Sequence, residues 1–139
     1  MNTVICIVLI VYLIVMSVFD IKTLSIPLWP GIVCFGMLSV TLLVMGTTPL
    51  RIAAGILVGG LLYALSYVSR GGIGRADALV YVVTGTVLGL YKNLEVLFLS
   101  LTMAAMVGAF LLIFKKVDRK YRLPFVPFTC VACGMVMLL

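Results

Sequence analysis

Six apolar segments separated by short polar stretches make up almost the whole chain, and they leave little choice of fold. They cover residues 2–19, 28–46, 50–69, 77–92, 94–114 and 123–139, the fourth and sixth being short. A helix needs about 20 residues to cross the membrane core, whereas a membrane β-barrel would show alternating segments of about ten. Since 65% of the residues are hydrophobic and 10% are charged, a soluble domain could not bury this apolar surface. The sequence predicts an all-α polytopic membrane protein, a bundle of about six transmembrane helices forming one domain over residues 1–139.

The basic residues are distributed unevenly among the connections between these segments. The connections after the first, third and fifth segments hold eight of them, and those after the second and fourth hold two: Lys22, Arg70, Arg75, Lys115, Lys116, Arg119, Lys120 and Arg122 against Arg51 and Lys92. Cytoplasmic connections of membrane proteins are enriched in Lys and Arg. We therefore predict a multi-pass protein of the inner (cytoplasmic) membrane with both chain ends outside.

The ends and the charge of the chain fit this interpretation. The first segment has no basic start and runs into Asp20 without a small-residue cleavage site, so we expect it to stay as a helix. Because the net charge of +6 follows the topology, we predict no nucleic-acid partner. The basic connection at residues 115–122 anchors the topology, and it has a possible second role in holding anionic lipid headgroups or the acidic end of a substrate. Membrane lipids are thus predicted partners, and no particular oligomeric state is predicted.

Residues 71–77, which read Gly-Gly-Ile-Gly-Arg-Ala-Asp, are the one place where three glycines, a cation and a carboxylate together interrupt the apolar sequence. Three glycines in four residues permit backbone conformations that other residues avoid. The acid, Asp77, opens the fourth apolar segment. A carboxylate is costly at that depth, so its presence suggests a function. A helix N-terminus favours an anion at this position. The simpler interpretation is a cytoplasmic turn with its acid in water, but three glycines exceed what a turn needs.

A second acid, Asp20, ends the first apolar segment at the same predicted depth and on the same side. The other two carboxylates differ, because Glu95 lies on the outer side and Asp118 lies in a basic connection. Two neighbouring carboxyls cannot both ionise, so they share a proton. Such a pair can activate water and protonate a substrate. Alternatively, Asp20 is a solvated acid beside Lys22, or the two acids form the proton relay of a transporter.

Several other chemistries are excluded or disfavoured by the composition. The chain has no histidine, which removes Ser-His-Asp and Cys-His catalysis. The cysteines Cys6, Cys34, Cys130 and Cys133 lie inside apolar segments and are interpreted as small buried residues. Cys130 and Cys133 form a C-x-x-C pair, but zinc needs two further ligands. We predict no metal and no cofactor.

Two glycine pairs and one polar stretch carry further expectations. Gly55 and Gly59, and likewise Gly85 and Gly89, have the G-x-x-x-G spacing that allows helices to approach closely. Close packing there would help to bring the ends of the first and fourth segments together. The stretch at residues 92–95 is expected to be an ordinary solvated connection outside the membrane.

Three motifs in order resemble those of the type IV prepilin peptidases, a family of intramembrane aspartyl proteases. Residues Gly71, Gly72, Gly74 and Asp77 match the family's G-G-x-G-x-G-D motif. The second motif is an Asp followed by Ile-Pro, represented by Asp20, Ile26 and Pro27. The third, P-F-x-P-F, is matched at residues 124–128. The resemblance implies that Asp20 and Asp77 are catalytic, with the glycines and Ile-Pro supporting the site.

The resemblance also implies a substrate. The family cuts the short basic leader from prepilins or pseudopilins at the cytoplasmic membrane face, after a glycine and before a hydrophobic stem helix. The chain looks like the short form found with tight-adherence (Flp) pili, which lacks the N-terminal region with paired C-x-x-C motifs. The long form also methylates the new N-terminus, and we predict no such activity here.

The chain departs from the family pattern at three positions. Ala76 stands where the family has glycine, and it would be strained if a positive φ were needed. Leu79 replaces a common lysine and Leu28 a common asparagine. The alternatives to an active peptidase are a catalytically inactive relative that binds pilin precursors or assembles with a secretion machine, a small proton-coupled transporter or channel subunit, and a purely structural membrane protein.

Overall fold

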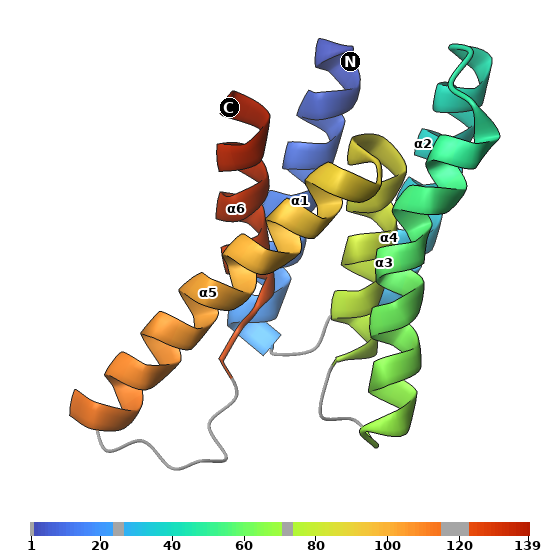
Figure 1. Cartoon of the computed structure of the whole chain (residues 1–139). Coiled ribbons are helices and arrows are strands. Elements are labelled where there is room, and N and C mark those ends of the chain that lie inside the picture. Colours follow the sequence, from blue (N-terminus) through green and yellow to red (C-terminus); the bar gives the residue numbers. More distant parts are fainter. Residues whose placement is uncertain (1, 24–26, 71–73, 115–122) are drawn as a thin grey trace.

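The computed structural model describes residues 2–23, 27–70, 74–114 and 123–139, and these form six helices (Figure 1). The helices are α1 (Thr3–Thr23), α2 (Leu28–Val44), α3 (Pro49–Val68), α4 (Arg75–Leu88), α5 (Leu90–Phe114) and α6 (Val126–Leu138). Helices α1, α3 and α5 are long and apolar enough to cross a membrane, while α2 and α6 are shorter apolar helices. The predicted all-α fold of a membrane protein is confirmed.

Two helix ends near the predicted acids differ from the sequence-based boundaries. α1 continues to Thr23, so Asp20 lies in its last turn and not in the following connection. Nothing in this turn breaks a helix, and Lys22 is a favourable cation at the C-terminal end. α4 begins at Arg75, which places Asp77 inside its first turn.

The predicted solvated connection at residues 92–95 is wrong. Gly89 alone separates α4 from α5, and residues 92–95 belong to the first turns of α5. Gly89 has a φ of 79° and a ψ of 179°, a backbone conformation essentially confined to glycine, so the chain reverses at a single residue. Asn93 is fully buried, because its side chain bonds backbone groups that helix packing leaves inside.

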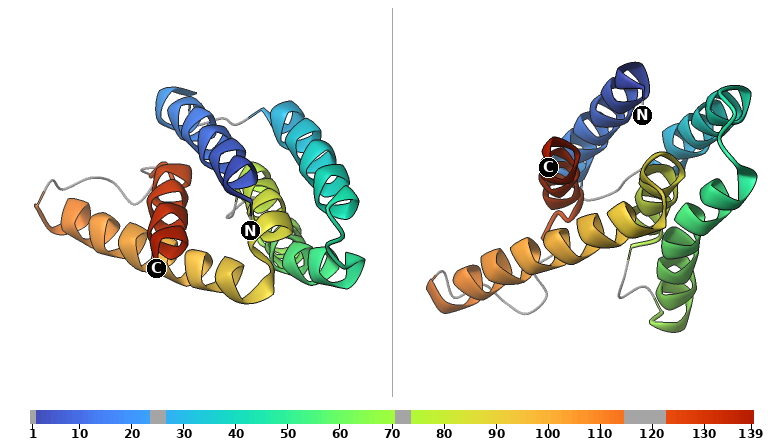
Figure 2. Two further views of the ribbon diagram at one scale, coloured as in Figure 1. Left: turned by 90° about the horizontal axis from the view of Figure 1, so that it is seen from above. Right: turned by 45° about the horizontal axis from the view of Figure 1, so that its top comes forward.

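α4 lies at the centre of the bundle and contacts α1, α2, α3 and α5 (Figure 2). Most of its residues are buried. Gly55 of α3 and Gly85 of α4 meet so closely that a Cβ atom added to Gly55 would lie 1.8 Å from the Gly85 carbonyl oxygen. A Cβ atom at Gly59 would lie 2.4 Å from Val82 of α4. The predicted close packing is confirmed for these three glycines, whereas Gly89 forms the turn.

The two ends of the bundle hold different parts of the chain. Both chain termini lie at the upper end in Figure 1, while α1 ends, and α4 and α6 begin, toward the lower end. α5 runs obliquely across the other helices in the same view. Its outer side exposes large apolar residues, including Phe98, Met106, Phe110 and Ile113, as expected for a surface in contact with lipid.

Candidate active site

Asp20 is held at the start of α6 by a backbone hydrogen bond. The side chain is 6% exposed, and its Oδ2 atom accepts the Val126 N–H at 3.1 Å. The first N–H groups of a helix have no partner within that helix. Asp20 therefore caps α6 from another helix, an arrangement in which the helix dipole stabilises a negative charge.

The P-F-x-P-F motif provides this donor. Pro127 has no N–H group, and the Phe128 N–H donates to the Phe125 carbonyl oxygen at 3.1 Å. Val126, which lies between Phe125 and Pro127, has an N–H group that donates to Asp20. The missing N–H group of Pro127 thus helps to define which donors the first turn of α6 presents.

Asp77 lies over the glycine that precedes α4. A Cβ atom added to Gly74 would lie 2.8 Å from Asp77 Oδ2, so a side chain at residue 74 would displace the carboxyl group. Gly74 has a φ of −65° and a ψ of 131°, which any residue can adopt. Its contribution is therefore space for the acid and not an unusual backbone conformation.

The expected strain at Ala76 does not arise. Ala76 lies inside α4, and among the described residues other than glycine, Arg70 is the one with a positive φ. Leu79, in place of the family's lysine, packs against α2, where a Cβ atom added to Gly31 would lie 2.4 Å from Leu79 Cδ2. Leu28 is the first residue of α2. The helices thus accommodate all three departures.

The two acids interact electrostatically. Burial, and after it the negative charge of Asp20, raise the pKa of the Asp77 carboxyl from 3.8 to about 6. Asp77 lies in the first turn of α4, and α4 is not among the helices long and apolar enough to cross a membrane. The carboxyl group of Asp77 therefore lies outside the candidate membrane-spanning helices. An acid with a pKa near 6 can exchange a proton at neutral pH, as general acid catalysis requires.

A cavity of about 250 Å³ lies beside Asp77. Its walls come from four parts of the chain and are mostly apolar: Leu62 of α3, Gly74 before α4 with Asp77 and Tyr81 of α4, Leu97 and Leu101 of α5, and Leu123 and Phe125 before α6. An apolar cavity with a carboxyl group in its wall is typical of a site that binds an apolar group next to reactive chemistry.

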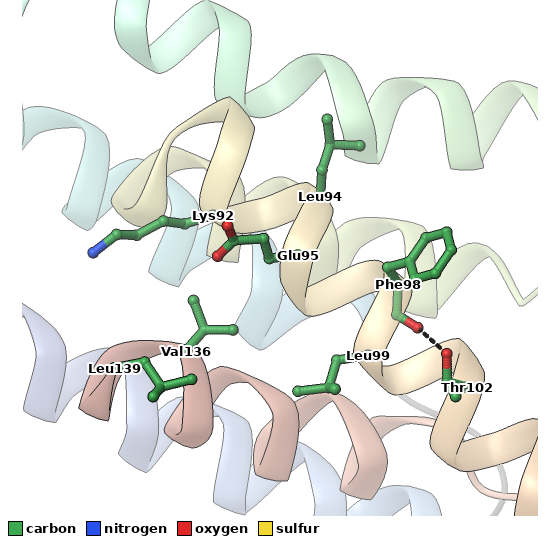
Figure 3. A pocket seen from close by; sticks show the side chains of 8 residues that line it. All are labelled: Lys92, Leu94, Glu95, Phe98, Leu99, Thr102, Val136 and Leu139. Atoms are coloured by element: carbon green, nitrogen blue, oxygen red, sulfur yellow. Dashed lines mark hydrogen bonds between the residues drawn. The ribbon is translucent and has the colours of Figure 1, made fainter.

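A larger hollow of about 790 Å³ lies between α5 and α6 at the opposite end of the bundle (Figure 3). Leu99 and Val136 lie between the two helices there, with Lys92 and Glu95 near the start of α5. Neither Asp20 nor Asp77 borders it, so this hollow is not the candidate active site.

The structure thus describes four of the predicted site residues. Asp20, Gly74 and Asp77 lie as described above, and Pro27 directly precedes α2 with a φ of −65°. Gly71, Gly72 and Ile26 lie outside the described residues. The catalytic assignment of Asp20 and Asp77 stays a prediction.

One group of buried hydroxyl side chains is not predicted by the sequence pattern: Tyr81, Ser100 and Thr129. Tyr81 follows Asp77 by four residues on α4, which places both side chains on one face of the helix. That spacing was the available signal. Nothing local in the sequence connects Tyr81 to Ser100 or Thr129.

The cysteines offer no comparable site. All four are free thiols, and Cys133 is buried in α6. Among the described ranges, no group of three or more Cys, Asp or Glu side chains is arranged to hold a metal ion.

One comparison with known proteins gives a match. A model of the type IV leader peptidase family matches residues 7–109, a range that includes both acids and the glycine-rich stretch and ends before the motif at residues 124–128. No curated protein and no solved structure matches the chain. Because the match covers most of the chain and the three motifs occur in order, the chain belongs to the type IV leader peptidase family.

Proposed function

We propose that this protein is a membrane-embedded aspartic endopeptidase that removes the leader peptide of type IV prepilins or pseudopilins at the cytoplasmic membrane face. One observation carries the proposal. The pKa of Asp77 is raised to about 6, in part by the negative charge of the buried acid Asp20. Both acids lie toward the end of the bundle where α4 and α6 begin. A pair of carboxyls in different surroundings is the arrangement that divides acid and base roles.

The surroundings of each acid suggest its role. Asp20 accepts a backbone N–H at a helix N-terminus, so it acts as the ionised base and takes a proton from the attacking water. Asp77 carries the shared proton and gives it to the carbonyl oxygen of the scissile bond. The water oxygen bonds to the carbonyl carbon, giving a neutral diol. As the C–N bond breaks, Asp20 returns its proton to the departing amine and Asp77 recovers the proton from the diol.

The cavity beside Asp77 gives the substrate a place to bind. Its volume of about 250 Å³ and its leucine and phenylalanine walls suit an apolar side chain close to the scissile bond. The acids lie near an end of the bundle, whereas a transporter would place its acids nearer the middle of the membrane. This position supports proteolysis over proton-coupled transport.

The proposed orientation places the acids in reach of a leader in the cytoplasm. Eight of the ten basic residues lie in the connections assigned to that side. A reporter that is active only in the cytoplasm, fused after Leu139, is expected to be silent. An active fusion would reverse the orientation.

The proposed activity can be tested by co-expression with a candidate prepilin, with leader removal read as a mass shift. The wild-type protein is expected to cleave, and Asp20→Asn and Asp77→Asn to lose at least about 1,000-fold in rate, because each removes a group that transfers a proton. Cleavage by either variant at the wild-type rate would refute the mechanism. Failure of the wild type on several prepilins would favour an inactive relative with a role in pilus or secretion assembly.

A further inference from the structure

Tyr81 links three helices through its hydroxyl group. The side chain is fully buried, and the hydroxyl oxygen lies 2.5 Å from Ser100 Oγ of α5 and 3.1 Å from Thr129 Oγ1 of α6. Ser100 and Thr129 are also fully buried. A hydrogen-bonded network without access to water is expensive to break, because each hydroxyl group would be left without a partner.

The three hydroxyl protons can be assigned so that the network is complete, although the Thr129 hydroxyl has a second acceptor, the Phe125 carbonyl oxygen, at 3.4 Å. The Ser100 hydroxyl donates to the Leu97 carbonyl oxygen at 3.0 Å. Tyr81 can then donate to Ser100, and Thr129 can donate to Tyr81, so that each hydroxyl donates once. The network ends on the backbone of α5, a fixed acceptor, and this favours one arrangement of the three helices.

Tyr81 also touches the first turn of α6 in a second way. Its ring centroid lies 6.2 Å from that of Phe125, the residue before Val126. The Thr129 N–H donates to the Phe125 carbonyl oxygen at 3.2 Å. Tyr81 therefore holds both sides of this turn, the hydroxyl of Thr129 and the ring of Phe125. Val126, which donates to Asp20, lies between them in sequence.

We infer that Tyr81 and Thr129 form a positioning pair for the two acids. Tyr81 lies one turn after Asp77 on α4 and fixes the first turn of α6, whose Val126 N–H fixes Asp20. A continuous set of contacts thus joins the helix of one acid to the hydrogen bond of the other. The inference deepens the proposed function and rests on it for its effect on catalysis, but the contacts themselves can be tested separately.

Four substitutions separate positioning from general packing. Tyr81→Phe keeps the ring and removes the hydroxyl. Thr129→Val removes the second hydroxyl at nearly constant volume, and Thr129→Ser keeps it. Thr86→Val is the matched control, because Thr86 is a buried residue of α4 whose hydroxyl bonds the Val82 carbonyl oxygen of its own helix.

The first measurement is steady-state cleavage of a prepilin in detergent or vesicles. Tyr81→Phe and Thr129→Val are expected to lower kcat roughly ten- to a hundredfold with KM within about twofold of the wild type, since misplaced catalytic groups cost rate and not binding. Thr129→Ser is expected to restore most of kcat, and Thr86→Val to keep it. A kcat near the wild-type value in both Tyr81→Phe and Thr129→Val would overturn the inference.

The second measurement does not need activity. Hydrogen–deuterium exchange is followed on a peptide that covers residues 124–128, in which Pro124 and Pro127 have no N–H, so few amides contribute. Exchange is expected to be faster in Tyr81→Phe and Thr129→Val than in the wild type, Thr129→Ser or Thr86→Val. Unchanged exchange in both hydroxyl-deleted variants would overturn the positioning role. Faster exchange in the two variants, combined with a wild-type protein that cleaves no prepilin, would support positioning and refute the peptidase proposal.

Discussion

The two ends of α4 hold buried polar groups in opposite ways. At the C-terminal end, Asn93 of α5 donates to the carbonyl oxygens of Gly55 at 3.3 Å and Tyr81 at 3.0 Å, and it accepts the Thr84 hydroxyl at 2.8 Å. At the N-terminal end, Asp77 lies partly buried over Gly74, with its pKa raised by burial and by Asp20.

This difference separates stability from reactivity. A buried amide with its hydrogen bonds made holds α3, α4 and α5 together. A carboxyl that burial makes hard to ionise weakens the folded state but can carry a proton. The same short helix is therefore anchored at one end and, in the proposed mechanism, reactive at the other. Substitutions at the anchored end should change stability, and substitutions at the reactive end should change activity.

The largest expected effect is at the glycine contact of the anchored end. In Gly55→Val, the new Cβ would lie 1.8 Å from the backbone oxygen of Gly85, and a backbone cannot rotate away as a side chain can. We expect a loss of at least about 3 kcal/mol in the free energy of unfolding. The measurement is denaturant unfolding in mixed micelles. Gly60→Ala on the same helix is the control, because its Cβ would meet no atom within 4 Å. Equal stability of the two variants would show that α3 and α4 do not approach this closely.

The next effect is the loss of the Asn93 hydrogen bonds. Asn93→Ala leaves two buried carbonyl oxygens without this donor, and we expect about 2 kcal/mol of destabilisation. Leader cleavage per folded molecule should stay within about twofold of the wild type, because Asn93 bonds the backbone carbonyl of Tyr81 and not the hydroxyl that links Tyr81 to Ser100 and Thr129. Thr102→Val is the control, since the Thr102 hydroxyl bonds within α5 on an exposed surface. A selective loss of kcat in Asn93→Ala would break the division between the two ends.

A smaller effect, of the opposite sign, is expected from the charge of Asp77. Its folded pKa of about 6 exceeds the ordinary 3.8, so the folded protein binds more protons than the unfolded chain between these values. The stabilisation from the protonated acid is complete below pH 4 and is lost as pH rises to about 6. One pKa unit corresponds to about 1.4 kcal/mol.

Asp77→Asn should remove this dependence. Allowing for the partial exposure of Asp77, we expect the variant to be about 1–2 kcal/mol more stable than the wild type above pH 6, and similar to it near pH 4. Unfolding measured from pH 4 to pH 8 gives the difference. Glu95→Gln, at an exposed acid of α5, is the control for removing a carboxylate. A less stable Asp77→Asn protein at pH 7 would mean that burial of Asp77 has no cost.

The hydrophobic pattern predicted the fold because each of the six apolar segments forms a helix. It failed between α4 and α5, where Gly89 makes the whole turn and Asn93 looked like a solvent-exposed residue. A polar residue in a short break between apolar segments usually indicates a loop. Asn93 is buried instead because helix packing leaves carbonyl oxygens inside the bundle that accept its hydrogen bonds. In the same way, the apolar pattern ends α1 before Asp20, whereas the structure continues the helix to Thr23 and buries Asp20 against the Val126 N–H.

The candidate site was predicted unevenly. The sequence favours Asp20 and Asp77 because Glu95 is predicted on the outer side, Asp118 lies among cations, and motifs surround the two chosen acids. The partner of Asp20 is the backbone N–H of Val126, 106 residues away, and a backbone group leaves no mark in a sequence. The link from Tyr81 to Thr129 spans 48 residues between ordinary-looking side chains. Such contacts follow from helix packing and not from local pattern.

The smallest expected effect sharpens the comparison at the reactive end. Gly74→Ala would place a Cβ 2.8 Å from Asp77 Oδ2, and this clash is with the end of a side chain that can rotate. Because the backbone of Gly74 is already ordinary, the helix should form normally and stability should change by less than about 0.5 kcal/mol. The displaced carboxyl should lower kcat about tenfold with little change in KM. Gly108→Ala, in open space on α5, is the control. An unfolded Gly74→Ala protein would show that this glycine serves the backbone, and full activity would show that Asp77 does not need the space that Gly74 leaves.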